Sequence, residues 1–75
     1  MTPAQCRAAR ALLGMSQSDL AAAADVAKRT IASFEAETRQ PYARTIAAIR
    51  ERLEAAGVIF LDENGAGPGV RLRKA

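Results

Sequence analysis

The sequence predicts a mainly α-helical fold, with four helices in one compact domain and a short C-terminal β-hairpin or strand. The first observation is composition: 49% of the 75 residues are apolar, many are alanine, and aromatic residues are scarce, which suits closely packed helices. The second is that helix-start and helix-stop residues divide residues 2–57 into four segments with apolar spacings of three and four. The third is an alternating apolar pattern after Gly57.

The first helix is expected from about Pro3 to Leu13. Thr2 supplies a hydroxyl that can cap the helix start, and proline suits the first helical position. Gly14 follows the helix in the place where a left-handed residue usually ends one. The predicted buried face consists of Cys6, Ala9, Leu13 and, beside them, Leu12.

The second helix is expected to begin after Ser16, because the run Ser-Gln-Ser-Asp at 16–19 resembles a capping box with aspartate in place of glutamate. It ends near Ala24, where Asp25 begins a tight connection. A third helix is expected over about 28–36, with Ile31 and Phe34 buried at i, i+3.

Two cations, Lys28 and Arg29, stand at the start of this third helix. The helix macrodipole disfavours positive charge at an N-terminus by some tenths of a kcal/mol per charge. We interpret the pair as meeting something negative.

A fourth helix is expected from about Tyr42 to Ala56, with Gly57 ending it. Its predicted core stripe consists of Ile46, Ile49, Leu53 and Ala56. Residues 58–61 and 70–73 then read as strands around the turn-forming pair at 64–65, which indicates a β-hairpin or one strand with a flexible arm.

The hairpin needs cover for its apolar side chains, because an isolated hairpin is marginal in water. That cover comes from the helical body or from a second copy of the chain. The candidate dimer interface therefore consists of Val58, Phe60, Val70 and Leu72. The expected division is residues 1–57 as a helical domain and residues 58–75 as a hairpin or arm that joins two copies.

Composition argues against catalysis, metal binding and a membrane span. There is no histidine, and the single Cys6 falls on an apolar helix face as a core residue. No nucleophile has a base at a familiar spacing, and the glycines at 65, 67 and 69 lack the setting of a phosphate loop. No apolar run approaches the roughly 20 residues of a span. We expect a cytoplasmic protein without catalytic residues, cofactor or metal.

The unit from Ser16 to Glu35 holds the two short helices joined by a tight turn, with the small Ala21 where they would cross most closely. Such packing projects the second helix outward. In a helix-turn-helix, the exposed N-terminal half of that helix meets base edges in the major groove of double-stranded DNA. Here it carries Lys28, Arg29, Thr30 and Ser33.

The chain resembles the Cro/C1-type (XRE family) helix-turn-helix domain. The resemblance is carried by LGMSQSDLA at 13–21, VAKRTI at 26–31, FE at 34–35 and Pro41, and it covers roughly residues 4–53. It is fairly specific because these features agree in order and spacing.

The resemblance implies a lambda-repressor-like fold, with five helices in the family and four here, and dimers on a palindromic operator. It implies that Gln17 lies near a phosphate or the first base, while Arg10 forms a structural ion pair with Glu35. The residues that it implies as DNA contacts, on the third helix and around the loop that follows it, are Lys28, Arg29, Ser33, Arg39, Gln40 and Arg44.

Three features depart from the family pattern. Ala27 replaces the usual serine or threonine cap, which costs about 1 kcal/mol. Glu37 replaces the usual glycine or asparagine, which argues against a positive-φ turn there. The C-terminal hairpin has no counterpart in the common domain.

The leading hypothesis is a sequence-specific transcriptional repressor that acts as a homodimer. The alternative is an antitoxin or anti-activator that binds another protein through the hairpin. A nonspecific nucleoid protein is disfavoured, because phosphate neutralisation drives such binding and the net charge is only +3.

Overall fold

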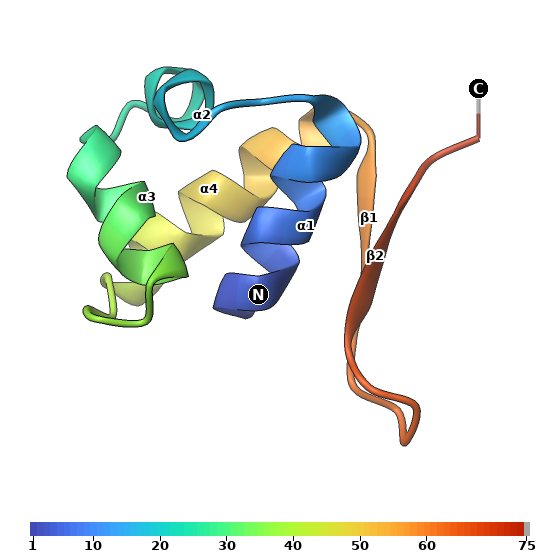
Figure 1. Cartoon of the computed structure of the whole chain (residues 1–75). Helices are drawn as coiled ribbons and strands as arrows, with labels where there is room; N and C mark the ends of the chain where they lie inside the picture. The colour runs from blue at the N-terminus through green and yellow to red at the C-terminus, as the bar shows by residue number, and fades with distance from the viewer. Residues whose placement is uncertain (75) are drawn as a thin grey trace.

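Four helices and a two-stranded antiparallel hairpin make up the computed structural model, which describes residues 1–74 (Figure 1). The helices and strands are α1 (Pro3–Leu13), α2 (Gln17–Ala24), α3 (Lys28–Glu35), α4 (Ala43–Ala55), β1 (Val58–Leu61) and β2 (Gly69–Leu72). The expected fold class is confirmed, and each helix boundary lies within one residue of its expected place. Within residues 1–74, no helix combines the length and the apolar character needed to cross a membrane.

Capping boxes begin α1 and α2. The Thr2 hydroxyl accepts from the Gln5 amide at 3.0 Å, and the Gln5 side chain accepts from the Thr2 amide at 2.9 Å. Ser16 and Asp19 exchange the same two bonds at 2.9 and 3.0 Å. No side chain caps α3, because Ala27 stands at its N-cap. Two helix starts are therefore fixed by local chemistry, whereas the start of α3 and that of α4, where Tyr42 forms no capping bond, depend on tertiary packing.

One hydrogen-bond pattern ends α1, α2 and α3. Each helix is followed by a residue in a left-handed conformation: Gly14 (φ 67°) and Asp25 (φ 57°) directly follow α1 and α2, and Glu37 (φ 61°) comes one residue later, after the right-handed Ala36 that follows α3. At α3, the Glu37 amide donates to the Phe34 carbonyl and the Thr38 amide to the Ser33 carbonyl, both at 3.0 Å. The expectation against a positive φ at Glu37 is therefore wrong, since two backbone bonds hold the turn.

The core lies between α1, α2, α3 and α4 and beneath β1. Its largest fully buried side chains are Phe34, Leu20, Ile31, Ile49, Leu53, Val58 and Cys6. Two expected core residues, Leu12 and Ala56, are exposed. Each residue turns a helix by about 100°, so Leu12 lies well away from the face that carries Cys6. Ala56 follows the last residue of α4, where the chain has already left the core stripe.

The hairpin packs one face against α1 and α4. Val58 pairs with Leu72 and Phe60 with Val70, so these four side chains share that inner face. Val58 is 1% exposed and Phe60 8%, so the helical body of the same chain covers them. Because covered side chains have little area left for a partner, the candidate dimer surface narrows to Val70 and Leu72.

A buried glutamine fastens the hairpin to α1. Gln5 Nε2 donates to the carbonyl of Leu61 at 3.1 Å and to the carbonyl of Gly69 at 3.0 Å. These two residues face each other across the strands, so one side chain fixes both. On the β1 side, the Arg50 guanidinium lies 4.9 Å from the centre of the Phe60 ring.

Candidate nucleic-acid interface

The turn between α2 and α3 sets the direction of α3. The Val26 amide donates to the Ala21 carbonyl at 3.0 Å, which closes the turn directly after α2. Ala21 is buried and small, so α2 and α3 pack closely. Ile31 and Phe34 face the core, while α3 itself stands at the end of the molecule far from the hairpin (Figure 1).

The outer face of α3 carries the predicted DNA contacts. Lys28 and Arg29 are exposed, and Thr30 and Ser33 are half-buried. The Ser33 hydroxyl donates to the Arg29 carbonyl at 2.7 Å, which leaves its oxygen free to accept a bond. The ion pairs within residues 1–74 are Arg10 with Glu35 and Arg50 with Glu54. The two cations at the start of α3 therefore face solvent without a carboxylate partner.

A groove of about 880 Å³ runs between α3, the 36–42 loop and the start of α4. It brings together five of the predicted DNA contacts, namely Arg29, Thr30, Ser33, Arg39 and Gln40. Among its described lining residues there are two guanidinium groups and no carboxylate. The groove is therefore a positively charged hollow beside the exposed face of α3, which suits a phosphate backbone.

Tyr42 also lines this groove, and sequence reasoning missed it. Its side chain is 76% exposed, and the Arg44 guanidinium carbon lies 5.5 Å from the ring centre. Arg44 is exposed and lies beside the groove without lining it. The available signal was an aromatic residue outside every apolar stripe, directly after Pro41.

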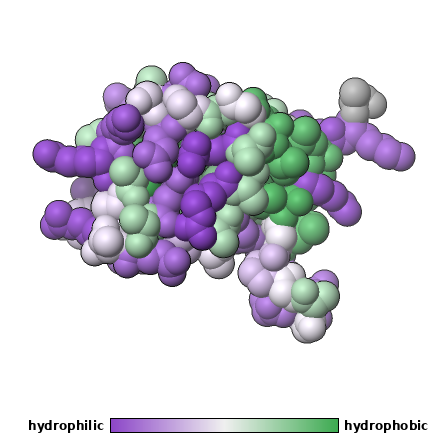
Figure 2. All heavy atoms as spheres, in the orientation of Figure 1, coloured by the Kyte–Doolittle hydropathy of each residue, from purple (hydrophilic) through white to green (hydrophobic). Residues whose placement is uncertain are grey.

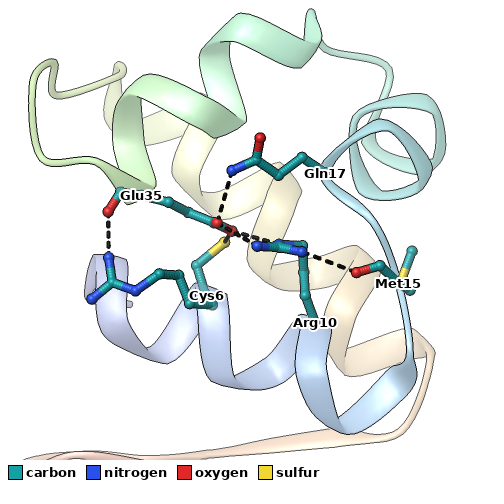
Figure 3. Close-up of polar contacts among 6 residues, drawn as sticks. Cys6, Arg10, Met15, Gln17 and Glu35 are labelled. Carbon is teal, nitrogen blue, oxygen red and sulfur yellow. Dashed lines mark hydrogen bonds and ion pairs between the residues drawn. The ribbon is translucent and has the colours of Figure 1, made fainter.

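Gln17 does not share this surface position. Its side chain is half-buried, and its Nε2 donates to Glu35 Oε1 at 3.1 Å (Figure 3). A buried carboxylate needs hydrogen-bond donors, and Gln17 supplies one. The structure therefore places the amide of this predicted DNA contact in an internal network.

That network centres on the Glu35 carboxylate, whose side chain is 3% exposed. Arg10 binds it with two bonds, Nε to Oε2 at 2.7 Å and Nη2 to Oε1 at 2.6 Å (Figure 3). The Cys6 thiol lies 3.1 Å from Oε2 and donates to it, and Arg7 donates to the Glu35 main-chain carbonyl. The expected pair of Arg10 and Glu35 is formed, and it is part of a larger cluster.

The cluster shifts the pKa values of its members. Burial raises the pKa of the Glu35 carboxyl, but hydrogen bonds from Arg10, Gln17 and Cys6 outweigh it and hold the pKa below its usual range. Burial, together with the neighbouring Glu35, raises the pKa of Cys6 to about 12. The thiol therefore stays protonated at neutral pH, where it acts as a hydrogen-bond donor rather than a nucleophile.

Comparison with known proteins agrees with this geometry. A family model described as Helix-turn-helix matches residues 7–56. The match includes all of α2, α3 and α4 and most of α1, and it stops before β1. No curated protein matches the chain.

Proposed function

This chain belongs to the Cro/C1-type (XRE) helix-turn-helix family of DNA-binding transcription regulators, and we propose that it is a sequence-specific repressor. In this proposal two copies bind a palindromic operator as a homodimer. Each copy places α3 in the major groove, and the half-sites lie about one helical turn, or ~34 Å, apart.

The observation that carries the proposal is the uncompensated positive charge at the start of α3. Lys28 and Arg29 are exposed, oppose the helix dipole and have no carboxylate partner within residues 1–74. A base edge or a phosphate supplies the missing negative partner. The positive groove beside α3 supports the same orientation.

The roles of individual side chains follow from their positions. Arg29 reads a base pair, because a guanidinium can bind guanine O6 and N7 with two bonds. Thr30 and Ser33 line the groove together with Arg29 and act beside it, and the exposed Lys28 acts at the first position of the helix. The side chains assigned to the DNA backbone flank the groove, and they are Arg39, Gln40, Tyr42 and Arg44.

Repression needs no further parts, because a bound dimer can block polymerase at its site. Residues 1–57 are the DNA-binding part, and the hairpin from residue 58 joins two copies. The rival function is that of an antitoxin or anti-activator, in which the exposed Leu72 side of the hairpin contacts a different protein. The oligomeric state of the isolated chain separates these alternatives.

The test is a gel-shift and footprint on DNA from upstream of the protein's own coding sequence, with excess random competitor. We expect retained binding to that fragment and two protected half-sites. An affinity for the upstream fragment that is no higher than the affinity for random DNA would refute sequence recognition. The slope of log affinity against log salt counts phosphate contacts and separates a steep nonspecific binder from a specific one.

A further inference from the structure

The outer edge of β2 is open. Figure 1 shows β2 in front of β1, with α1 to one side of the hairpin. The Arg73 amide donates to the Gly57 carbonyl at 2.7 Å, in register with the β1–β2 pairs. Bonded and non-bonded pairs alternate along an antiparallel ladder, so the backbone groups of Val70 and Leu72 point away from β1.

No other described residue forms a hydrogen bond with the outward N–H and C=O groups of Val70 and Leu72. Apart from the ladder, the hydrogen bonds of residues 1–74 reach the backbone of β2 only at Gly69, from Gln5. Leu72 is 46% exposed and Leu12 43%, and Figure 2 shows hydrophobic surface gathered at this end of the molecule. An open edge beside apolar surface is a place where another strand can add.

The charges of the hairpin are separated along its length. Asp62 and Glu63 lie at the loop end, and a run of three cations lies at the other end, which consists of Arg71, Arg73 and Lys74. Glu63 Oε1 accepts from the amides of Gly65 at 2.7 Å and Gly67 at 3.0 Å, so its carboxylate is held against Gly67. None of these five charged side chains forms an ion pair with another described residue, and Arg73 Nη2 donates to the main-chain carbonyl of Glu54 at 3.1 Å.

We infer that a second copy of the chain adds its β2 antiparallel to this edge, centred on Val70, to form a four-stranded sheet across two chains. The inference rests on the homodimer proposed above and names its surface. In this register the partner's Arg73 lies opposite Gly67, where the Glu63 carboxylate is held. The partner's Arg71 lies opposite Gly69, so no two arginines face each other. The partner's Leu72 amide donates to the carbonyl of Pro68, which has no N–H to donate in return.

The symmetry of this pairing suits DNA binding. A two-fold axis that continues an antiparallel sheet is perpendicular to the sheet, so both helical bodies lie on the same sheet face. α3 lies at the end of the body away from the hairpin (Figure 1). Both α3 helices therefore face the same side, as two half-sites on one duplex require.

The first test is a charge exchange, read as the dimer dissociation constant by analytical ultracentrifugation. Glu63→Arg or Arg73→Glu alone places like charges together twice per dimer, so we expect each to raise the constant on the order of tenfold. An equal mixture of the two variants restores both attractions, and it should form a heterodimer as tight as the wild-type dimer. Glu51→Arg and Arg52→Glu on the exposed face of α4 are the matched controls.

The second test blocks the backbone edge. Leu72→Pro removes an outward N–H and leaves the ladder intact, so it should give a folded monomer. Arg71→Pro removes the bond to Ile59 and should disrupt the hairpin itself.

The outcomes separate this inference from the proposed function. A wild-type chain that is monomeric at roughly 100 µM, or a Leu72→Pro chain that stays dimeric, overturns the inference. So do charge reversals that act no more strongly than their controls. A dimer that these changes break but that ignores DNA supports the inference and contradicts the repressor.

Discussion

The two ends of α3 are held in opposite ways. At the C-terminal end, Glu35 receives hydrogen bonds from Arg10, Gln17 and Cys6, which tie α3 to α1 and α2. At the N-terminal end, no side chain caps the helix, and the two cations Lys28 and Arg29 have no partner within residues 1–74. Anchoring one end firmly lets the other carry charges that do not stabilise the fold, so stability and the proposed DNA recognition occupy separate turns of one helix.

The largest predicted effect comes from removing the anchor's cation. Arg10→Met leaves the Glu35 carboxylate buried without its charge partner, so we expect about 3 kcal/mol of lost unfolding free energy. Urea unfolding followed by circular dichroism measures it. Glu54→Ala breaks the exposed pair with Arg50 and should cost under about 1 kcal/mol. Equal losses of unfolding free energy in Arg10→Met and Glu54→Ala would show that the buried pair at the C-terminal end of α3 is no more important than an exposed pair.

A smaller effect should appear in the pH dependence of stability. The pKa of Glu35 is lower in the folded chain than in the unfolded chain, so the charged carboxylate stabilises the fold above its ordinary value of about 4.3. This contribution is lost as the pH falls from there through the folded-state pKa. We expect the wild type to lose more unfolding free energy than Glu35→Gln between neutral pH and acid. If the unfolding free energies of the wild type and Glu35→Gln fell in parallel with pH, the fold would not hold the Glu35 carboxylate in its charged form.

At the free end, Arg29→Ala should act on recognition and raise the unfolding free energy by no more than some tenths of a kcal/mol. Loss of a two-bond base contact should reduce discrimination between operator and random DNA by about 1–3 kcal/mol. Arg39→Ala, across the groove, should weaken binding to both DNAs by similar amounts, because phosphate contacts carry no sequence. Fluorescence anisotropy titrations measure both. If Arg29→Ala lost equal affinity for operator and random DNA, Arg29 would contact the DNA backbone and not a base.

The smallest predicted effect is a gain. Ala27→Ser supplies the missing cap of α3 and should raise the unfolding free energy by about 1 kcal/mol. Ala47→Ser, exposed in the middle of α4, is the control, and it should cost a few tenths of a kcal/mol. No gain at Ala27 would mean that the anchored C-terminal end already fixes the whole helix.

Local chemistry explains which features the sequence predicted. Thr2 with Pro3, Ser16 with Asp19, and Gly14 each act within a few residues, and each marks the helix end that the structure shows. The burial of Ile31 and Phe34 was also predicted, because the i, i+3 spacing of a buried helix face is a local pattern. The family match over residues 7–56 agrees with the part of the chain where such signals are densest.

The features that the sequence did not predict depend on distant partners. Gln17 contacts a carboxylate eighteen residues away, and the amide of Gln5 reaches carbonyls 56 and 64 residues away. Both look like ordinary polar helix residues until the tertiary structure supplies those partners. The prediction for Glu37 failed for another reason, because backbone bonds at the end of α3 impose a left-handed turn that a glutamate side chain disfavours.

The fastening of the hairpin by Gln5 has a consequence for the order of events during protein synthesis. The ribosome makes α1 first, yet the buried side-chain amide of Gln5 has both of its carbonyl acceptors only when Gly69 has been made. Val58 and Phe60, which close the core, also emerge late. The emerging helices therefore wait with an incomplete core, and they can reach their final packing only after residues 58–69 have left the exit tunnel.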